Sequence, residues 1–150
     1  MNGIEEYRRL IQELCEFTGI SHWEEVADAQ HIEVDGTTVG MLVEQAPDTC
    51  RLCLYFDLGI EGHSDIYRGM LEANLAIDPE ETGYFGSHPE SGAIVYRVNL
   101  PLTEDISGME LALRIQDSLH AGRGKLAQLR TGRSLPLNAI DKADGTLLAI

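Results

Sequence analysis

The stretch TCRLCLYFDL, residues 49–58, decides the fold class because its side chains alternate in character as they do along a β-strand. One face of this strand is apolar and carries Cys50, Leu52, Leu54, Phe56 and Leu58. The opposite face carries Arg51, Cys53, Tyr55 and Asp57. We therefore expect one face to pack on a core and the other to be at least partly open to solvent or to a partner.

Shorter strand candidates lie on both sides of this stretch. Residues 31–34 and 37–44 are separated by Asp35-Gly36, a two-residue hairpin signal, and a Pro47-Asp48 turn leads into residues 49–58. Further along, residues 82–87 and 93–100 flank a turn at residues 89–92. The short turns predict antiparallel pairing, because a parallel connection needs a long crossover.

Three segments show helical periodicity. Residues 4–17 form an amphipathic pattern that Gly19 ends, and residues 107–129 stack Leu111, Ile115 and Leu119 at spacings of four. Residues 64–77 begin at Ser64 and are apolar over so wide an arc that we expect burial on two sides, with a second copy of the chain supplying one of them. Residues 21–30 are polar and acidic, and are expected to form a loop or a short turn.

The expected class is thus α+β: an antiparallel, twisted sheet of about five strands with three helices, in the order α-β-β-β-α-β-β-α. A length of 150 residues predicts one domain, over residues 1–130. Residues 131–150 show no clear periodicity and are expected to be a C-terminal extension.

The charge excludes some partners. A formal charge of -14 disfavours nucleic acid or anionic lipid, because binding phosphate needs clustered Lys and Arg. Residues 1–113 carry -17 and residues 114–150 carry +3, so a basic partner could be attracted to the body. No apolar run is long enough to span a membrane, residues 1–14 do not resemble a secretory signal, and three cysteines fit a reducing compartment. We expect a cytosolic protein.

No motif makes a case for catalysis, a metal or a cofactor. Cys50 and Cys53 have redox or zinc spacing, but residues three apart in a strand point to opposite faces, so neither a disulfide nor a shared metal is expected. The five histidines show no metal-binding spacing. Residues 122–125, GRGK, lack the leading glycine and the following Ser or Thr of a phosphate loop.

One segment resembles a known family. The sequence MLEANL (residues 70–75), followed by TGYFG (82–86), PESGAIV (89–95) and NLPL (99–102), resembles the class I type III secretion chaperones, the Tir-chaperone or CesT-like family. The resemblance covers about residues 4–129. It departs at Gly62-His63-Ser64, where the family often has a Leu-Pro pair, and at the C-terminal extension.

The resemblance implies a bacterial, cytoplasmic homodimer involved in virulence, without enzymatic activity or cofactor. Such a dimer binds the N-terminal region of a secreted effector and keeps it extended and secretion-competent without ATP, and the ATPase of the secretion apparatus is a further candidate partner. The family's dimer implies an interface at the middle helix, through Ile66, Met70, Leu71 and Leu75.

Effector binding requires apolar grooves and free strand edges. The candidates on the first helix and the strands are Leu10, Leu14, Ile32, Val34, Val39, Met41, Cys53 and Tyr55. Plain core packing is the alternative for each, since periodicity does not separate a groove from a core. Two other functions stay open: a dimeric adaptor or regulatory domain of the same fold outside secretion, which would bind a folded partner, and a small enzyme with a carboxylate or histidine in a cleft.

Overall fold

The fold is described from a computed structural model, which covers residues 3–60, 64–76 and 83–131. These residues form four helices and five strands in the order α1 (Gly3–Thr18), α2 (Trp23–Ala29), β1 (His31–Val34), β2 (Thr37–Gln45), β3 (Cys50–Asp57), α3 (Ser64–Leu75), β4 (Gly83–Ser87), β5 (Ile94–Pro101) and α4 (Gly108–Arg130). The α+β class is confirmed.

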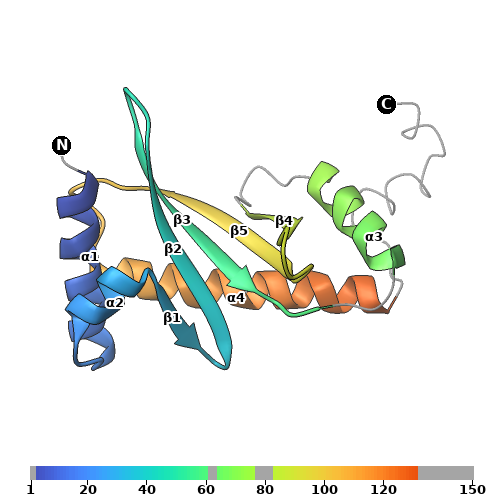
Figure 1. Cartoon of the computed structure of the whole chain (residues 1–150), viewed down its shortest axis with the longest axis horizontal. Coiled ribbons are helices and arrows are strands. Elements are labelled where there is room, and N and C mark those ends of the chain that lie inside the picture. Colours follow the sequence, from blue (N-terminus) through green and yellow to red (C-terminus); the bar gives the residue numbers. More distant parts are fainter. Residues whose placement is uncertain (1–2, 61–63, 77–82, 132–150) are drawn as a thin grey trace.

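The strands form one antiparallel sheet in the order β1-β2-β3-β5-β4, which Figure 1 shows as a strongly twisted ribbon. The stretch that decides the fold class lies at the centre: Phe56 on β3 is opposite Val39 on β2 and Tyr96 on β5. The edges of the sheet are β1 and β4.

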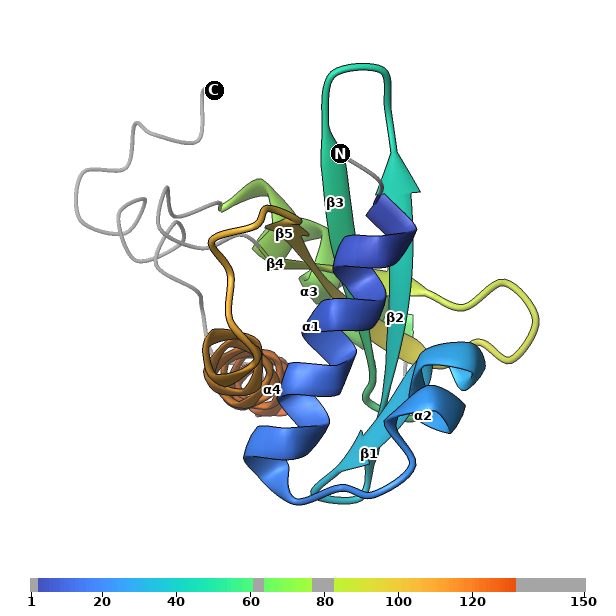
Figure 2. The same ribbon diagram turned by 90° about the vertical axis from the view of Figure 1, so that its left-hand side faces the viewer.

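Helices α1 and α4 cover the apolar face of the sheet. Figure 2 shows α1 crossing the strands beside α4, which is seen nearly end-on. Leu52, Leu54 and Phe56 of β3 are fully buried there, as are Leu10 and Ile11 of α1. The core therefore lies between the sheet and the α1–α4 pair.

Two glycines allow the closest approaches to α4. A side chain at Gly108 would place its Cβ 2.3 Å from the carbonyl carbon of Glu13, so the start of α4 lies directly on the backbone of α1. A Cβ at Gly122 would lie 2.8 Å from the ring of Tyr96. Gly122 lowers helix propensity in isolation, yet α4 continues past it to Arg130, because this position packs α4 onto β5.

The expectation of a loop or a short turn at residues 21–30 is wrong. Helix α2 forms there, and its contacts with α1 are tertiary: the Tyr7 hydroxyl donates to the Ala27 carbonyl at 3.0 Å, and Arg8 pairs with Asp28 at 3.0 Å. The Arg8 guanidinium also lies 5.3 Å from the centre of the Trp23 ring. No side-chain cap marks the start of α2, which is why the sequence carries no capping signal for it. The described residues therefore form four helices rather than the three expected.

The other predicted elements agree with the structure to within one or two residues. The Asp35-Gly36 hairpin is confirmed: both residues have positive φ, 49° and 75°, as the tightest hairpin turn requires. The predicted end of the middle helix at Ile77, the strand residue Thr82 and residues 132–150 of the C-terminal extension lie outside the described residues.

Candidate binding site

A small groove opens between the end of α1, strand β1 and α4. Its volume is about 180 Å³. It is lined by Leu14, Thr18, Ile20, Ile32, Glu33, Val34, Ala112, Ile115 and Gln116. Apolar side chains make up most of the walls, and Thr18, Glu33 and Gln116 supply polar groups. This mixture suits an apolar side chain of a partner, with polar groups available to its backbone.

Local sequence signals shape two walls of the groove. Gly19, with φ 78°, ends α1 in the left-handed conformation, and the Ile20 amide donates back to the Cys15 carbonyl at 2.9 Å. This turn brings Ile20 to the groove while leaving 39% of it exposed. The tight hairpin after Val34 fixes the register of β1, which turns Ile32 and Val34 to the helix side.

Three of the eight residues predicted for effector binding line this groove: Leu14, Ile32 and Val34. Leu10, Val39 and Met41 instead have no exposed surface and belong to the central core. The other residues that line the groove were not predicted from the sequence. Ile20 follows the helix-ending glycine, where an apolar contact is common and could have been expected, whereas Ala112 and Ile115 reach the groove only through the tertiary placement of α4.

Cys53 and Tyr55 lie on the opposite face of the sheet, around Arg97. The Arg97 guanidinium donates to Glu44 at 2.6 Å, to the Cys53 sulfur at 3.3 Å and to Asn99 at 3.2 Å. It also lies 5.3 Å from the centre of the Tyr55 ring. Cys53 is fully buried beneath this network, so it offers a partner no surface.

The network shifts two ionisation equilibria. Burial raises the pKa of the Cys53 thiol, and the Arg97 charge only partly opposes this, so the thiol stays protonated. Burial also acts to raise the pKa of Glu44, but its hydrogen bond with Cys53 and the charges of Arg97 and Arg51 outweigh it and lower that pKa. Cys50 lies on the core side of β3, so the two sulfurs face apart, as the strand pattern predicts.

Helix α3 has two distinct sides. Ile66 and Met70 are 6% and 4% exposed and pack into the core of their own chain. Leu71 and Leu75, one turn apart, are 72% and 76% exposed. Of the four residues predicted for the dimer interface, only these two therefore present apolar surface outward.

Asn74 of α3 occupies the outer edge of the sheet at β4. Its side-chain oxygen accepts from the Phe85 amide at 2.7 Å, and its nitrogen donates to the Phe85 carbonyl at 2.9 Å. One amide side chain thus takes the place of a neighbouring strand at that point of the β4 edge. No comparable side-chain bridge covers the β1 edge among the described residues.

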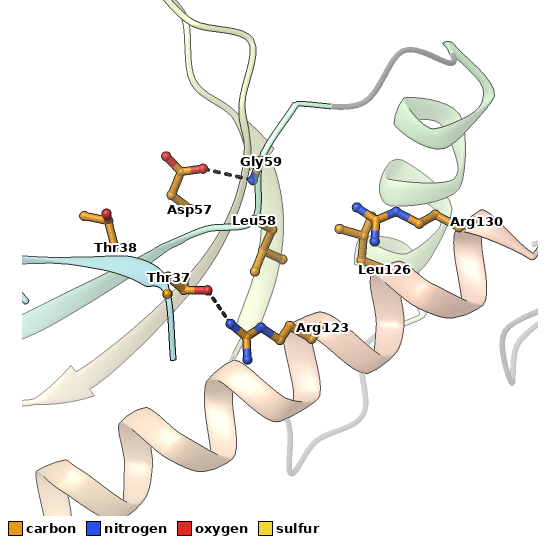
Figure 3. Close-up of a pocket in the computed structure, with 9 residues that line it drawn as sticks. Thr37, Thr38, Asp57, Leu58, Gly59, Arg123, Leu126 and Arg130 are labelled. Carbon is orange, nitrogen blue, oxygen red and sulfur yellow. Dashed lines mark hydrogen bonds between the residues drawn. The ribbon is translucent and has the colours of Figure 1, made fainter. Parts of the chain in front are cut away.

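A second, polar cavity of about 560 Å³ lies at the tip of the β1–β2 hairpin. It is lined by Gly36, Thr37, Thr38, Asp57, Leu58, Gly59, Arg123, Leu126 and Arg130. Figure 3 shows Arg123 reaching from α4 to Thr37, with a hydrogen bond of 2.6 Å to its hydroxyl. The same nitrogen donates to the Asp35 carbonyl at 2.8 Å.

Within the described ranges, no group of three or more His, Cys, Asp or Glu side chains is arranged to hold a metal ion. In the same part of the chain, no helix is long and apolar enough to cross a membrane.

Comparison with known proteins identifies a shared fold. No family model matches the sequence, and no curated protein matches it. Among solved structures, the chain is similar to the Yersinia pestis type III secretion chaperone SycH, solved in complex with a stable fragment of YscM2. The TM-score is 0.55 at 20% sequence identity, and the match covers 82% of this chain and 98% of SycH. This chain has the fold of a type III secretion chaperone.

Proposed function

We propose that this protein is a non-enzymatic type III secretion chaperone of the CesT-like family. It acts as a homodimer in the bacterial cytoplasm, binds the N-terminal region of a secreted effector and keeps it extended without ATP. The observation that carries the proposal is the apolar groove beside the β1 edge, in a fold shared with SycH, which was itself solved with a bound protein fragment.

The groove suits an extended segment better than a folded surface. At about 180 Å³ it accepts one or two apolar side chains. Among the described residues, the adjacent β1 strand pairs only with β2, so its outer edge can accept a further strand, whereas Asn74 occupies the β4 edge at Phe85. An extended segment would thus gain backbone hydrogen bonds from β1 and apolar contacts from the groove, which together offset the entropy cost of ordering it.

The dimer is proposed to form through the outer side of α3. Leu71 and Leu75 form an exposed apolar pair on a helix whose inner side is already packed, and a two-fold axis would bring the pair against its own copy. Ile66 and Met70 support the helix from beneath. The secretion ATPase remains a proposed partner, for which we assign no surface.

Affinity capture from the native bacterium tests this proposal, with a matched pair of variants. Ile20→Asp places a charge in the groove at a position 39% exposed, and Leu42→Asp places one on β2, outside the groove, at a position 43% exposed. Wild type and Leu42→Asp should retain one abundant, protease-sensitive partner, and Ile20→Asp should lose it.

The chaperone function would be supported if binding maps to the partner's N-terminal region and if that region has no stable structure when isolated. Equal retention by both variants would contradict the groove assignment. A partner bound only as a folded domain would favour the adaptor instead.

A further inference from the structure

The polar cavity at the hairpin tip lies in line with the apolar groove. Helix α4 contributes Gln116 to the groove and Arg123 and Arg130 to the cavity, and these three residues are spaced by seven, so they lie along one stripe of the helix. On the sheet side, β1 contributes Ile32 and Val34 to the groove, and Gly36 of the following turn and Thr37 at the start of β2 line the cavity. The groove and the polar cavity therefore follow one another along the same hairpin and the same helix.

The cavity has the opposite electrostatic character to the rest of the chain. Two arginines and one aspartate, Asp57, line it, whereas the whole chain carries -14. The Asp57 carboxylate is turned to the Gly59 amide, from which it accepts at 2.9 Å. An anion is therefore attracted to this point of a chain whose net charge is strongly negative.

Arg123 is held in place by the hairpin. Its two hydrogen bonds, to the Thr37 hydroxyl and the Asp35 carbonyl, both use the Nη2 nitrogen. A guanidinium has five N–H donors, so these two contacts leave the three on Nε and Nη1 for a ligand. The Arg123 side chain is thus ordered before a ligand binds, so binding does not carry the entropy cost of ordering it.

We propose that the Arg123 cavity binds an acidic side chain of the same extended segment whose apolar side chain occupies the groove. This inference rests on the proposed function and adds a sequence rule for the partner. Gln116 and Arg123 are separated by about 10 Å of helix at 1.5 Å per residue. An extended chain covers that distance in about three residues at 3.3 Å each. The partner segment therefore carries Asp or Glu three to four residues from its apolar anchor.

Synthetic peptides test this rule directly. The probes are acetyl-LVSSSD-amide and its neutral match acetyl-LVSSSN-amide, with the reversed pair acetyl-DSSSVL-amide and acetyl-NSSSVL-amide covering the other chain direction. Each is titrated into the full-length protein, and backbone amide shifts are followed by NMR. We expect every apolar anchor to shift the amides near Ile32. In one chain direction, the Asp peptide should also shift the amides of Thr38 and Gly59 and should bind about three- to tenfold more tightly than its Asn match.

Variants assign the effect to the cavity. Arg123→Gln should abolish the advantage of the Asp peptide, and Thr38→Glu, at an exposed position on the cavity wall, should do the same without removing the Arg123 contacts. Arg114→Gln is the matched control, because Arg114 is exposed on α4 and lines neither cavity. The advantage should also shrink as salt is raised.

The possible failures differ from one another. Groove shifts that are equal for Asp and Asn peptides, with silent cavity amides, would overturn the acidic-residue rule and leave the groove intact. No groove shifts with any peptide would contradict the proposed function itself. Cavity shifts with sodium phosphate but not with the Asp peptides would assign the cavity to a free anion, and the proposal would be wrong.

Discussion

Replacing Leu71 and Leu75 together by serine should convert the proposed dimer to a monomer without unfolding the chain. Both side chains are about three-quarters exposed in the single chain, so the monomer loses little on substitution. The apolar surface that they present to a second copy would disappear.

The magnitude follows from that exposure. Burying a whole leucine side chain contributes about 1.5–3 kcal/mol, so burying the 72% and 76% still exposed contributes about 1–2 kcal/mol for each. A two-fold dimer buries four such side chains, or about 4–9 kcal/mol in total. Since each 1.4 kcal/mol is a factor of ten, the dissociation constant should rise by about 10³- to 10⁶-fold.

Sedimentation velocity over a concentration series measures this change. The matched control is Met109→Ser with Leu113→Ser, because these two side chains form an equally spaced pair on α4 and are about half exposed. The α3 variant should sediment as a folded monomer, and the α4 variant as the wild-type dimer. An unchanged dissociation constant for the α3 variant, with an unchanged melting temperature, would refute the interface.

Three further predictions concern stability. Gly108→Ala should lower the free energy of unfolding in urea by about 1–3 kcal/mol, because its new Cβ meets the α1 backbone at 2.3 Å. Gly124→Ala on the same helix has open space around it and should raise that free energy by about 0.5–1 kcal/mol. Equal effects of the two substitutions would contradict the close α1–α4 packing. Asn74→Ala should cost about 1–3 kcal/mol and speed hydrogen exchange at the Phe85 amide, since that amide loses its partner; unchanged exchange would show that α3 does not cover the edge. The pKa of Glu44 is lower in the folded chain than in the unfolded chain, so the contribution of its carboxylate to folding stability is full above the unfolded pKa near 4.5 and is lost as pH falls through the folded pKa. The difference in unfolding free energy between wild type and Glu44→Gln should therefore close below pH 4.5. A difference that does not change with pH would refute the Glu44–Arg97 pairing.

The parts of the fold that sequence predicts best are those with local periodicity. The alternation of β3, the Asp35-Gly36 turn and the amphipathic pattern of α1 each specify their element within a few residues. Helix α2 was missed because a tyrosine and an arginine of α1 hold it, and neither contact leaves a local signal.

The candidate site was predictable only in part, for a related reason. An apolar side chain at the correct period is required equally by a core and by a groove, so Leu10 and Leu14 look alike in sequence although only Leu14 reaches the groove. Arg123 was noted only within a glycine-rich tetrapeptide. Its pairing with the hairpin tip is a contact between positions 86 residues apart, which no local pattern contains.

The most direct test of the account is hydrogen exchange on the complex of this protein with the N-terminal fragment of its captured partner. We predict strong protection of the β1 amides at His31 and Glu33, which face the open edge because Ile32 and Val34 are the residues bonded to β2. Little change is expected at Leu42, and the fragment should have no protected core of its own either free or bound. Protection confined to the Arg97 face of the sheet, or a fragment that keeps its own folded core in the complex, would contradict the chaperone account.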